Sequence, residues 1–346
     1  MTSSASISQL RPLDIHQILP KKIIRCFHTF QGGFIMSTLH QEREAKIAKI
    51  YHSREGLINS NGVDIGPQGD KVIAGADDRR DYHTLETGIP QDELRKILAD
   101  ATVILTDKDN LVQQEDGSFK LKVSKFERQG LPPCSDERFA TQHVGGWCSG
   151  FMVGPDIIVT AGHCGETEAE IQNTAYLFGF YVKSLDDSGT TEFSADQVYF
   201  GKELLAHDLS STGDYGVVRV DRTITAPNAT PLKVRDSDSL GLGRNLGVIG
   251  YPSGLPVKIA FGDTTVLRRD EDPWLFANLD TYGGNSGSAV FNEEGLVEGI
   301  LVRGAKDYDM DFVNNCFRSN QIEDSEGSEA ITKASAFVAK LPNGIE

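Results

Sequence analysis

One serine in this sequence lies in a glycine-rich stretch that suits a nucleophile. The stretch Thr281-Tyr-Gly-Gly-Asn-Ser-Gly-Ser288 follows an apolar segment and places Ser286 beside glycines. Glycines let the backbone turn sharply, so the N–H groups of Gly284 and Ser286 can converge on one point and form an oxyanion hole. A serine hydroxyl is a weak nucleophile unless a base lies beside it. Taken alone, the stretch is equally compatible with a glycine-rich turn that carries an incidental serine.

Two other parts of the chain offer the base and the acid that such a serine needs. His163 follows a β-branched run that predicts a buried strand. Asp214 opens a second strand-like run, and Asp208 is its rival as the acid. The order His163, Asp214, Ser286 is one of the orders in which the serine-protease triad recurs. These three side chains are therefore the candidate catalytic residues.

Several strings together resemble the chymotrypsin-fold serine peptidases, and within them the bacterial glutamyl-endopeptidase branch. Besides the serine stretch, the matching strings are Val72-Ile-Ala-Gly-Ala-Asp-Asp-Arg79, Cys148-Ser-Gly-Phe-Met-Val153, Thr160-Ala-Gly-His-Cys164, Asp214-Tyr-Gly and Gly250-Tyr-Pro252. The resemblance covers roughly residues 72 to 305. It implies a mainly β fold of two six-stranded antiparallel β-barrels with a C-terminal helix. It also favours Asp214 over Asp208, because the family's acid likewise precedes Tyr-Gly and an apolar strand.

The resemblance implies a serine endopeptidase that forms an acyl-enzyme. His163 would take the proton of Ser286 and deliver it to the leaving amine, while Asp214 orients the imidazole. This chemistry needs no metal and no organic cofactor. The alternative from another class is a catalytically silent binding protein on the same fold, although silent relatives usually lose a triad residue. An α/β-fold esterase fits less well, because its histidine comes last and its nucleophile string is Gly-x-Ser-x-Gly.

Substrate specificity stays open between acidic and basic side chains. Asp280 lies six residues before Ser286, where an acid attracts lysine or arginine in trypsin-like enzymes, but glutamyl endopeptidases can also carry this aspartate. The resemblance places Leu301 where that branch has a histidine that binds glutamate. Arg303 could supply the positive charge instead, or it could face solvent. Thr281 is expected to line the substrate pocket in either case.

The five cysteines allow a disulfide framework. The resembling family often bridges the positions of Cys148 and Cys164, which would close a loop of about 15 residues, worth roughly 3 kcal/mol. Cys134 and Cys316 could then pair, although four cysteines allow three connectivities. Cys26 lies in a segment that we expect to be absent from the working enzyme. Five reduced thiols in a cytosolic protein are the alternative.

The amino-acid composition limits which classes of protein and which partners fit this chain. The 346 residues include 39% hydrophobic and 24% charged residues, enough for a sizeable core. The net charge of −16 argues against binding to the phosphate backbone of nucleic acids. No stretch approaches the roughly 18 apolar residues of a membrane span. We expect protein or peptide substrates as partners, and a monomer.

The amino-terminal residues 1–71 are expected to form an extension. In the resembling family, the α-amino group of the first mature residue helps to build the specificity pocket, and Val72 matches that residue. A propeptide that ends at Lys71 is therefore a hypothesis, and an unprocessed extension is the alternative. The cysteines favour a secreted or periplasmic protein. However, residues 1–36 lack the 7–15 continuous apolar residues of a secretory signal.

The peptidase domain is expected over residues 72–346, with a first barrel at about 100–225 and a second at about 230–320. Apolar residues at helical spacing predict a short helix at 91–100 and a C-terminal helix at about 331–340. Strands are predicted at 101–106, 119–123, 148–153, 157–160, 176–182, 196–200, 214–220, 246–249, 258–262, 264–267, 275–279, 289–291 and 296–302.

Overall fold

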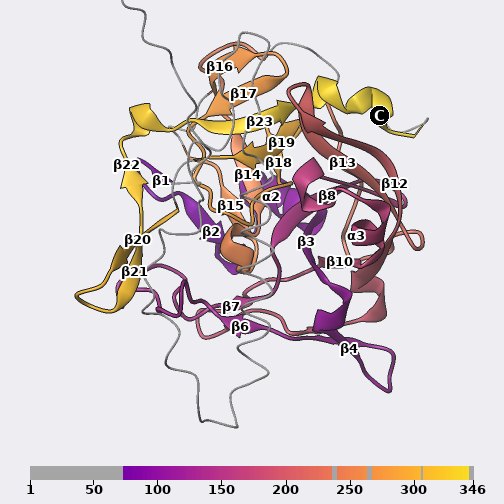
Figure 1. Cartoon of the computed structure of the whole chain (residues 1–346), viewed down its shortest axis with the longest axis horizontal. Coiled ribbons are helices and arrows are strands. Elements are labelled where there is room, and N and C mark those ends of the chain that lie inside the picture. Colours follow the sequence, from indigo (N-terminus) through magenta and orange to yellow (C-terminus); the bar gives the residue numbers. More distant parts are fainter. Residues whose placement is uncertain (1–72, 236–239, 263–266, 305–306, 343–346) are drawn as a thin grey trace, which may run out of the picture.

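The computed structural model describes residues 73–235, 240–262, 267–304 and 307–342 (Figure 1). The proposed extension 1–71, with Cys26 and the bond between Lys71 and Val72, lies outside the described residues. The described chain is built mainly from β-strands, as the sequence predicts. Its two largest units are a closed barrel and an eight-stranded sheet.

The closed barrel has six antiparallel strands in the order β10-β12-β13-β9-β8-β3. They are β3 (Thr102–Asp107), β8 (Cys148–Gly154), β9 (Ile157–Thr160), β10 (Thr174–Phe178), β12 (Val198–Ser210) and β13 (Gly213–Val220). Strands β8, β9 and β10 are buried along their whole length, which explains their continuous apolar runs. The strand predicted at 196–200 continues to Ser210, because β12 pairs with β13 as far as that residue.

The second unit is an eight-stranded sheet in the order β16-β17-β23-β19-β18-β14-β15-β2. Its strands are β2 (Arg79–Asp81), β14 (Gly247–Gly250), β15 (Lys258–Ala260), β16 (Leu267–Glu271), β17 (Trp274–Ala277), β18 (Ala289–Phe291), β19 (Val297–Arg303) and β23 (Glu329–Lys333). Sequence analysis placed this unit at about 230–320 and missed β2 and β23. Both lie outside that range and join through long-range pairing, which local patterns do not encode.

The C-terminal helix predicted at about 331–340 is wrong. The segment begins inside β23, which pairs with β17 on one side and with β19 on the other. Two 3-10 turns follow, η8 (Ala334–Ala336) and η9 (Val338–Lys340). The adjacent β-branched residues Ile331 and Thr332 favour a strand, and pairing on both edges buries them fully.

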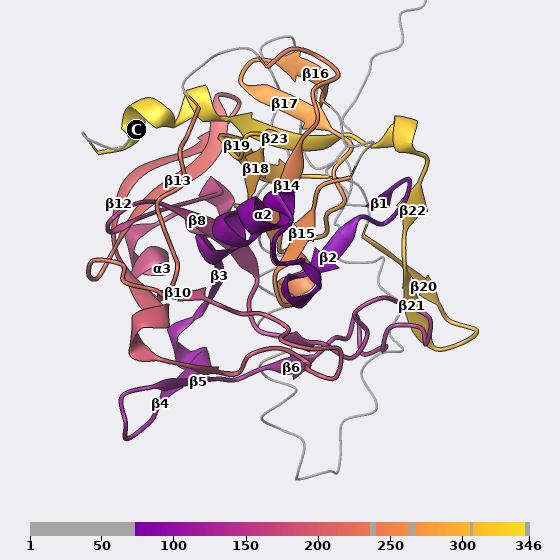
Figure 2. The same cartoon turned by 180° about the vertical axis from the view of Figure 1, so that it is seen from behind.

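Two α-helices pack beside these sheets. Helix α2 (Pro90–Asp100) confirms the short helix expected here and approaches β14 (Figure 2). It starts with proline in its first turn, where a missing N–H costs nothing, and Asp92 and Glu93 complement the positive end of the helix dipole. Helix α3 (Glu168–Gln172) starts at Thr167, whose side chain accepts a hydrogen bond from the amide of Glu170.

Short strands form the remaining sheets. They are β1 (Ile73–Ala74) with β22 (Gln321–Ile322), β4 (Leu111–Gln113) with β5 (Phe119–Leu121) and β11 (Glu192–Phe193), β6 (Ser124–Lys125) with β7 (His143–Val144), and β20 (Tyr308–Asp311) with β21 (Cys316–Ser319). Disulfides join Cys134 to Cys316 and Cys148 to Cys164, which confirms the expected pairing. Within the described ranges, none of the helices combines the length and the apolar character that crossing a lipid bilayer requires.

Candidate active site

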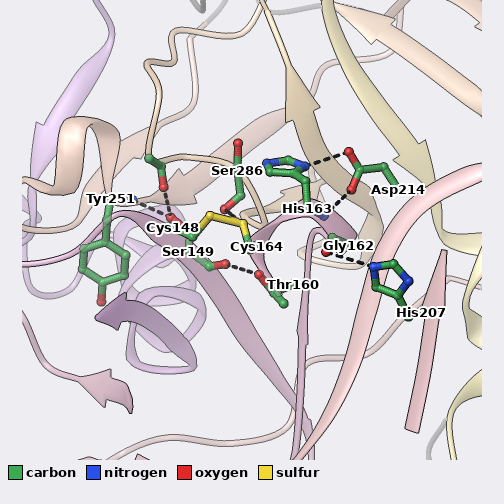
Figure 3. Close-up of a disulfide and its surroundings, with 11 residues drawn as sticks. Cys148, Ser149, Thr160, Gly162, His163, Cys164, His207, Asp214, Tyr251 and Ser286 are labelled. Carbon is green, nitrogen blue, oxygen red and sulfur yellow. Dashed lines mark hydrogen bonds and ion pairs between the residues drawn. A yellow bond between two sulfur atoms is a disulfide. The ribbon is translucent and has the colours of Figure 1, made fainter. Parts of the chain in front are cut away.

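His163 and Asp214 lie in direct contact. His163 is in the 3-10 turn η4 (Gly162–Cys164), immediately after β9, and Asp214 is the second residue of the neighbouring strand β13. The imidazole Nδ1 lies 2.8 Å from Asp214 Oδ2, and the backbone amide of His163 donates to Oδ1 over 3.1 Å (Figure 3). Because an ionised carboxylate only accepts hydrogen bonds, Nδ1 carries the proton when the ring is neutral. The other ring nitrogen, Nε2, can then act as a base.

The backbone of Asp214 is held in place from the second sheet. Thr332 Oγ1, on β23, lies 3.2 Å from the amide nitrogen of Asp214 and 3.0 Å from its carbonyl oxygen. The rival acid, Asp208, instead accepts a hydrogen bond from Thr212 Oγ1 over 2.6 Å, near the turn between β12 and β13. The structure thus brings Asp214 to the imidazole and keeps Asp208 in a hairpin.

The loop that carries Ser286 is fastened to strand β8 through Ser149. The amide of Ser149 donates to the carbonyl of Ser286 over 2.8 Å, and its hydroxyl donates to the carbonyl of Gly284 over 2.8 Å. That hydroxyl also accepts from the amide of Tyr251 over 3.0 Å. Figure 3 shows the Ser286 side chain beside the imidazole of His163. Sequence analysis did not single out Ser149, although it follows Cys148 in one of the matching strings.

Two glycines give the serine loop its shape. Gly284 and Gly287 adopt φ values of +99° and +89°, which other residues rarely reach. A β-carbon would lie 2.7 Å from the carbonyl oxygen of Tyr251 at Gly284, and 2.0 Å from that of Ser149 at Gly287. The tight turn therefore requires glycine at both positions. The amides of Gly284 and Ser286, the candidate oxyanion donors, both belong to this turn.

The disulfide between Cys148 and Cys164 ties the two halves of the site together. Cys164 directly follows His163, and Cys148 directly precedes Ser149 (Figure 3). His207 is half-buried on β12, and its Nε2 lies 3.1 Å from the carbonyl oxygen of Gly162. The turn that bears the imidazole is thus held from both sides.

Comparison with protein families identifies this unit. Residues 148–300 match the family model of a trypsin-like peptidase domain. These residues, somewhat less than half of the chain, are similar to trypsin-like peptidase domains. This confirms the resemblance to chymotrypsin-fold serine peptidases.

Individual relatives of this peptidase domain are distant. The chain is 29% identical over 159 residues to an extracellular metalloprotease of Bacillus subtilis (strain 168), covering 42% of this chain and 45% of that protein. It is 27% identical over 164 residues to a glutamyl endopeptidase of Staphylococcus aureus (strain MRSA252), covering 44% and 41%. The chain therefore spans less than half the length of these curated relatives.

Two solved structures are also similar to this chain, at lower sequence identity than the curated relatives. A structure of Glu endopeptidase in complex with MPD has a TM-score of 0.43 and 16% identity, covering 78% of this chain and 97% of that one. Human heparin binding protein has a TM-score of 0.45 and 11% identity, covering 79% and 97%.

The four candidate pocket residues of the peptidase domain have different surroundings. Asp280 accepts hydrogen bonds from the amides of Ala74 and Asp78, over 3.0 and 2.7 Å. Thr281 is fully buried and donates its hydroxyl to Glu329 Oε2 over 2.7 Å. Asp280 therefore contacts the amino-terminal segment, whereas Thr281 contacts β23.

The other two candidates lie in the second sheet. Leu301 is fully buried in an apolar cluster that includes Val248 and Leu279. Arg303 does not face solvent, because its side chain is buried and its guanidinium carbon lies 4.9 Å from the ring centre of Trp274. Burial lowers the pKa of Arg303, while the charge of Asp214 acts in the opposite direction. Sequence analysis missed Glu329, which no motif marks.

Two groups of potential metal-binding residues occur in the described part of the chain. One contains Cys148, His163 and Cys164, and the other contains Cys134, Asp311 and Cys316. Each group includes both sulfurs of a disulfide. Metal ions bind the thiolate form of cysteine, so neither group is a candidate metal site.

Asp280 should make the peptidase domain less stable as pH rises. Burial raises the pKa of Asp280 to about 7, and the amide hydrogen bonds from Asp78 and Ala74 oppose this only in part. The folded state therefore holds this proton more tightly than the unfolded chain, whose reference value is 3.8. The free energy of unfolding should consequently fall as pH rises between about 4 and about 7.

An Asp280→Asn variant, which cannot titrate here, measures this effect. Relative to wild type, its free energy of unfolding should gain about 1.4 kcal/mol per pH unit across that window. Urea unfolding at several pH values gives the comparison, with Asp208→Asn as the control for removing one carboxylate. A wild-type-to-variant difference that stays constant with pH would contradict the assignment.

Proposed function

We propose that the peptidase domain is a serine endopeptidase that hydrolyses peptide bonds through a His163, Asp214 and Ser286 triad. One observation carries this proposal: the imidazole Nδ1 lies 2.8 Å from a buried aspartate, on the turn next to the serine loop. Such a pair keeps Nε2 available as a general base. The shared anchor of the two loops, through Cys148, Ser149 and Cys164, supports the same conclusion.

The reaction proceeds in two acyl-transfer steps. In the first, Nε2 of His163 takes the hydroxyl proton of Ser286 while Oγ attacks the peptide carbonyl carbon. The protonated imidazole then gives its proton to the leaving amine, and an acyl-enzyme remains. In the second step, His163 takes a proton from water, the resulting hydroxide attacks the ester, and Ser286 regains its proton. Asp214 stays ionised throughout and stabilises the imidazolium cation.

The oxyanion of each tetrahedral intermediate would be held by the amides of Gly284 and Ser286. Each donor of this kind is worth on the order of 3 kcal/mol in the transition state. The positive φ at Gly284 and its close packing against Tyr251 support this role, because they fix the direction of the turn before reaction. Fixed donors need no reorganisation as charge develops.

The proposed function also implies a class of substrate, removal of an amino-terminal segment and a location outside the cytoplasm. We propose peptides or proteins as substrates, with Asp280, Thr281, Leu301 and Arg303 near or beneath the specificity pocket. Hydrogen bonds from Ala74 and Asp78 to Asp280 support a mature chain that starts at Val72, after removal of residues 1–71. Two disulfides and a relative whose name includes "extracellular" support a secreted or periplasmic protein.

A fluorophosphonate probe tests the function directly. The probe forms a covalent bond only with an activated serine, so it should label wild-type protein at Ser286, as located by peptide mass spectrometry. The Ser286→Ala variant and the heat-unfolded wild type should stay unlabelled. A folded wild-type protein that resists labelling would instead support the catalytically silent binding protein.

A further inference from the structure

Ser149 binds both of the residues whose amides are the proposed oxyanion donors. Its backbone amide donates to the carbonyl of Ser286 over 2.8 Å, and its hydroxyl donates to the carbonyl of Gly284 over 2.8 Å. The residue lies on β8 and is fully buried. The amide contact needs only the backbone, whereas the contact to Gly284 needs a side-chain donor. The hydroxyl of Ser149 therefore has a task that the strand alone does not perform.

The same hydroxyl connects Gly284 to a second loop. It accepts a hydrogen bond from the amide of Tyr251 over 3.0 Å (Figure 3). Its single proton goes to the carbonyl of Gly284, because a carbonyl oxygen can only accept. The chain continues from Tyr251 into the 3-10 turn η6 (Pro252–Gly254). Removal of the hydroxyl would deprive one buried backbone group on each loop of this partner.

The loop of Tyr251 in turn sets the direction of the Gly284 N–H group. The amide of Ser253 donates to the carbonyl of Gly283. The C=O and N–H bonds of a trans peptide point in opposite directions, so this contact turns the N–H of Gly284 away from Ser253. A β-carbon at Gly284 would lie 2.7 Å from the carbonyl oxygen of Tyr251 and 2.9 Å from the amide nitrogen of Ser253. Ser149 thus holds Gly284 directly, and also through the loop that orients its N–H group.

Strand β8 gives the hydroxyl a rigid base. The strand pairs with β3 on one side and with β9 on the other, and Ser149 lies opposite Ile104 of β3. The preceding residue, Cys148, is bonded to Cys164, which follows His163. The hydroxyl therefore ties the serine loop to the same strand that holds the turn of the imidazole. Such rigidity matters because a shift of about 1 Å in a catalytic group can cost on the order of 10²-fold in rate.

We propose that Ser149 is a positioning residue of this peptidase, whose hydroxyl keeps the N–H group of Gly284 aimed at the oxyanion. The inference rests on the proposed function and assigns a role to a side chain that acts through the backbone of the serine loop. The oxyanion develops only on the way to the tetrahedral intermediate. The hydroxyl therefore contributes to kcat and much less to KM.

Ser149→Ala tests the inference, because alanine keeps the backbone amide and removes the hydroxyl. Its kcat for a peptide substrate should fall by about 10- to 100-fold, at or below the loss typical of one missing oxyanion donor. KM should stay within about threefold of wild type, because uniform substrate binding is unchanged. A peptide boronic acid adds to the serine as a tetrahedral mimic, so its affinity should fall by about the same factor as kcat.

Thr102→Val is the matched control for a lost buried hydroxyl. Thr102 is as fully buried as Ser149, and its hydroxyl donates to the carbonyl of Leu98 over 2.9 Å instead of to the serine loop. The variant should lose stability but keep kcat within about threefold of wild type. Thermal melts of both proteins compare their stability.

Two further variants separate the hydroxyl from the packing around it. Ser149→Thr keeps a hydroxyl and should retain kcat within about fivefold of wild type. Ser149→Cys nearly keeps the size of the side chain but offers only a weak donor, so it should lose kcat by about tenfold. The cysteine variant decides the matter if the alanine variant does not fold. Peptide mapping checks that its bond between Cys148 and Cys164 is intact.

The outcomes separate the inference from the proposed function. An unchanged kcat in folded Ser149→Ala, or in folded Ser149→Cys where alanine does not fold, would overturn the inference and leave the proposed function standing. Equal losses of kcat in Ser149→Ala and Thr102→Val, or a raised KM with unchanged boronic acid affinity, would do the same. A wild-type protein that neither hydrolyses peptides nor is labelled at Ser286 would refute the proposed function, and the inference with it.

Discussion

Replacing Ser286 with alanine should lower kcat for peptide hydrolysis by about 10⁶-fold, because the acyl-enzyme can no longer form. The loss should appear in kcat, since the hydroxyl contributes to the transition state more than to substrate binding. The fold should persist, because the hydrogen bond that the amide of Ser149 donates to Ser286 reaches the backbone carbonyl and does not involve the side chain. Steady-state kinetics and a thermal melt of the same preparation measure both quantities.

Ser288, two residues away in the same loop, provides the control for Ser286→Ala. Its hydroxyl points to Asn285 Oδ1 over 3.4 Å, a weak contact, so Ser288→Ala should lose less than about tenfold in kcat. Peptidase activity that survives in Ser286→Ala, above a preparation without enzyme, would mean that another residue is the nucleophile.

Asp214→Asn should lower kcat by about 10⁴-fold at neutral pH. The amide of asparagine can donate to Nδ1 of His163, which would then carry the proton on Nε2, the wrong nitrogen for a base. The geometry should change little, because asparagine has the shape of aspartate and because Thr332 binds only the backbone of residue 214.

Asp208→Asn is the matched control for Asp214→Asn. Asp208 lies on the partner strand and binds Thr212 in the hairpin, so its replacement should leave kcat within about tenfold of wild type. The opposite outcome, a large loss at Asp208 and a small one at Asp214, would assign the acid to the hairpin. Circular dichroism of both variants checks that the barrel is intact.

The strands of the closed barrel could be predicted because the chemistry of a strand is local. The continuous apolar run of β9 and the mixed run of β13 are readable in the sequence, and both strands formed at the predicted positions. The prediction of a helix in the C-terminal segment was wrong because it, too, relied on local pattern alone. The apolar spacing around Ile331 suits a helix locally. The segment instead forms β23, because the edges of β17 and β19 provide backbone hydrogen-bond partners that lie far away in the sequence.

The sequence by itself determined which side chains could do chemistry in this protein. Ser286, His163 and Asp214 each lie in a short string whose neighbours define a turn or a strand end, so local conformation marks them. The pairing of Cys148 with Cys164 followed from the resemblance in these strings. Such features depend on a few adjacent residues.

Only the tertiary structure decided what each of these groups contacts. Ser149 reaches the serine loop across 135 positions to Gly284, and Thr332 reaches Asp214 across 118. Asp280 accepts hydrogen bonds from the amides of Ala74 and Asp78, and Thr281 donates one to Glu329. Burial, hydrogen bonding and charge balance depend on neighbours that folding brings together from distant parts of the chain, and no local spacing records them.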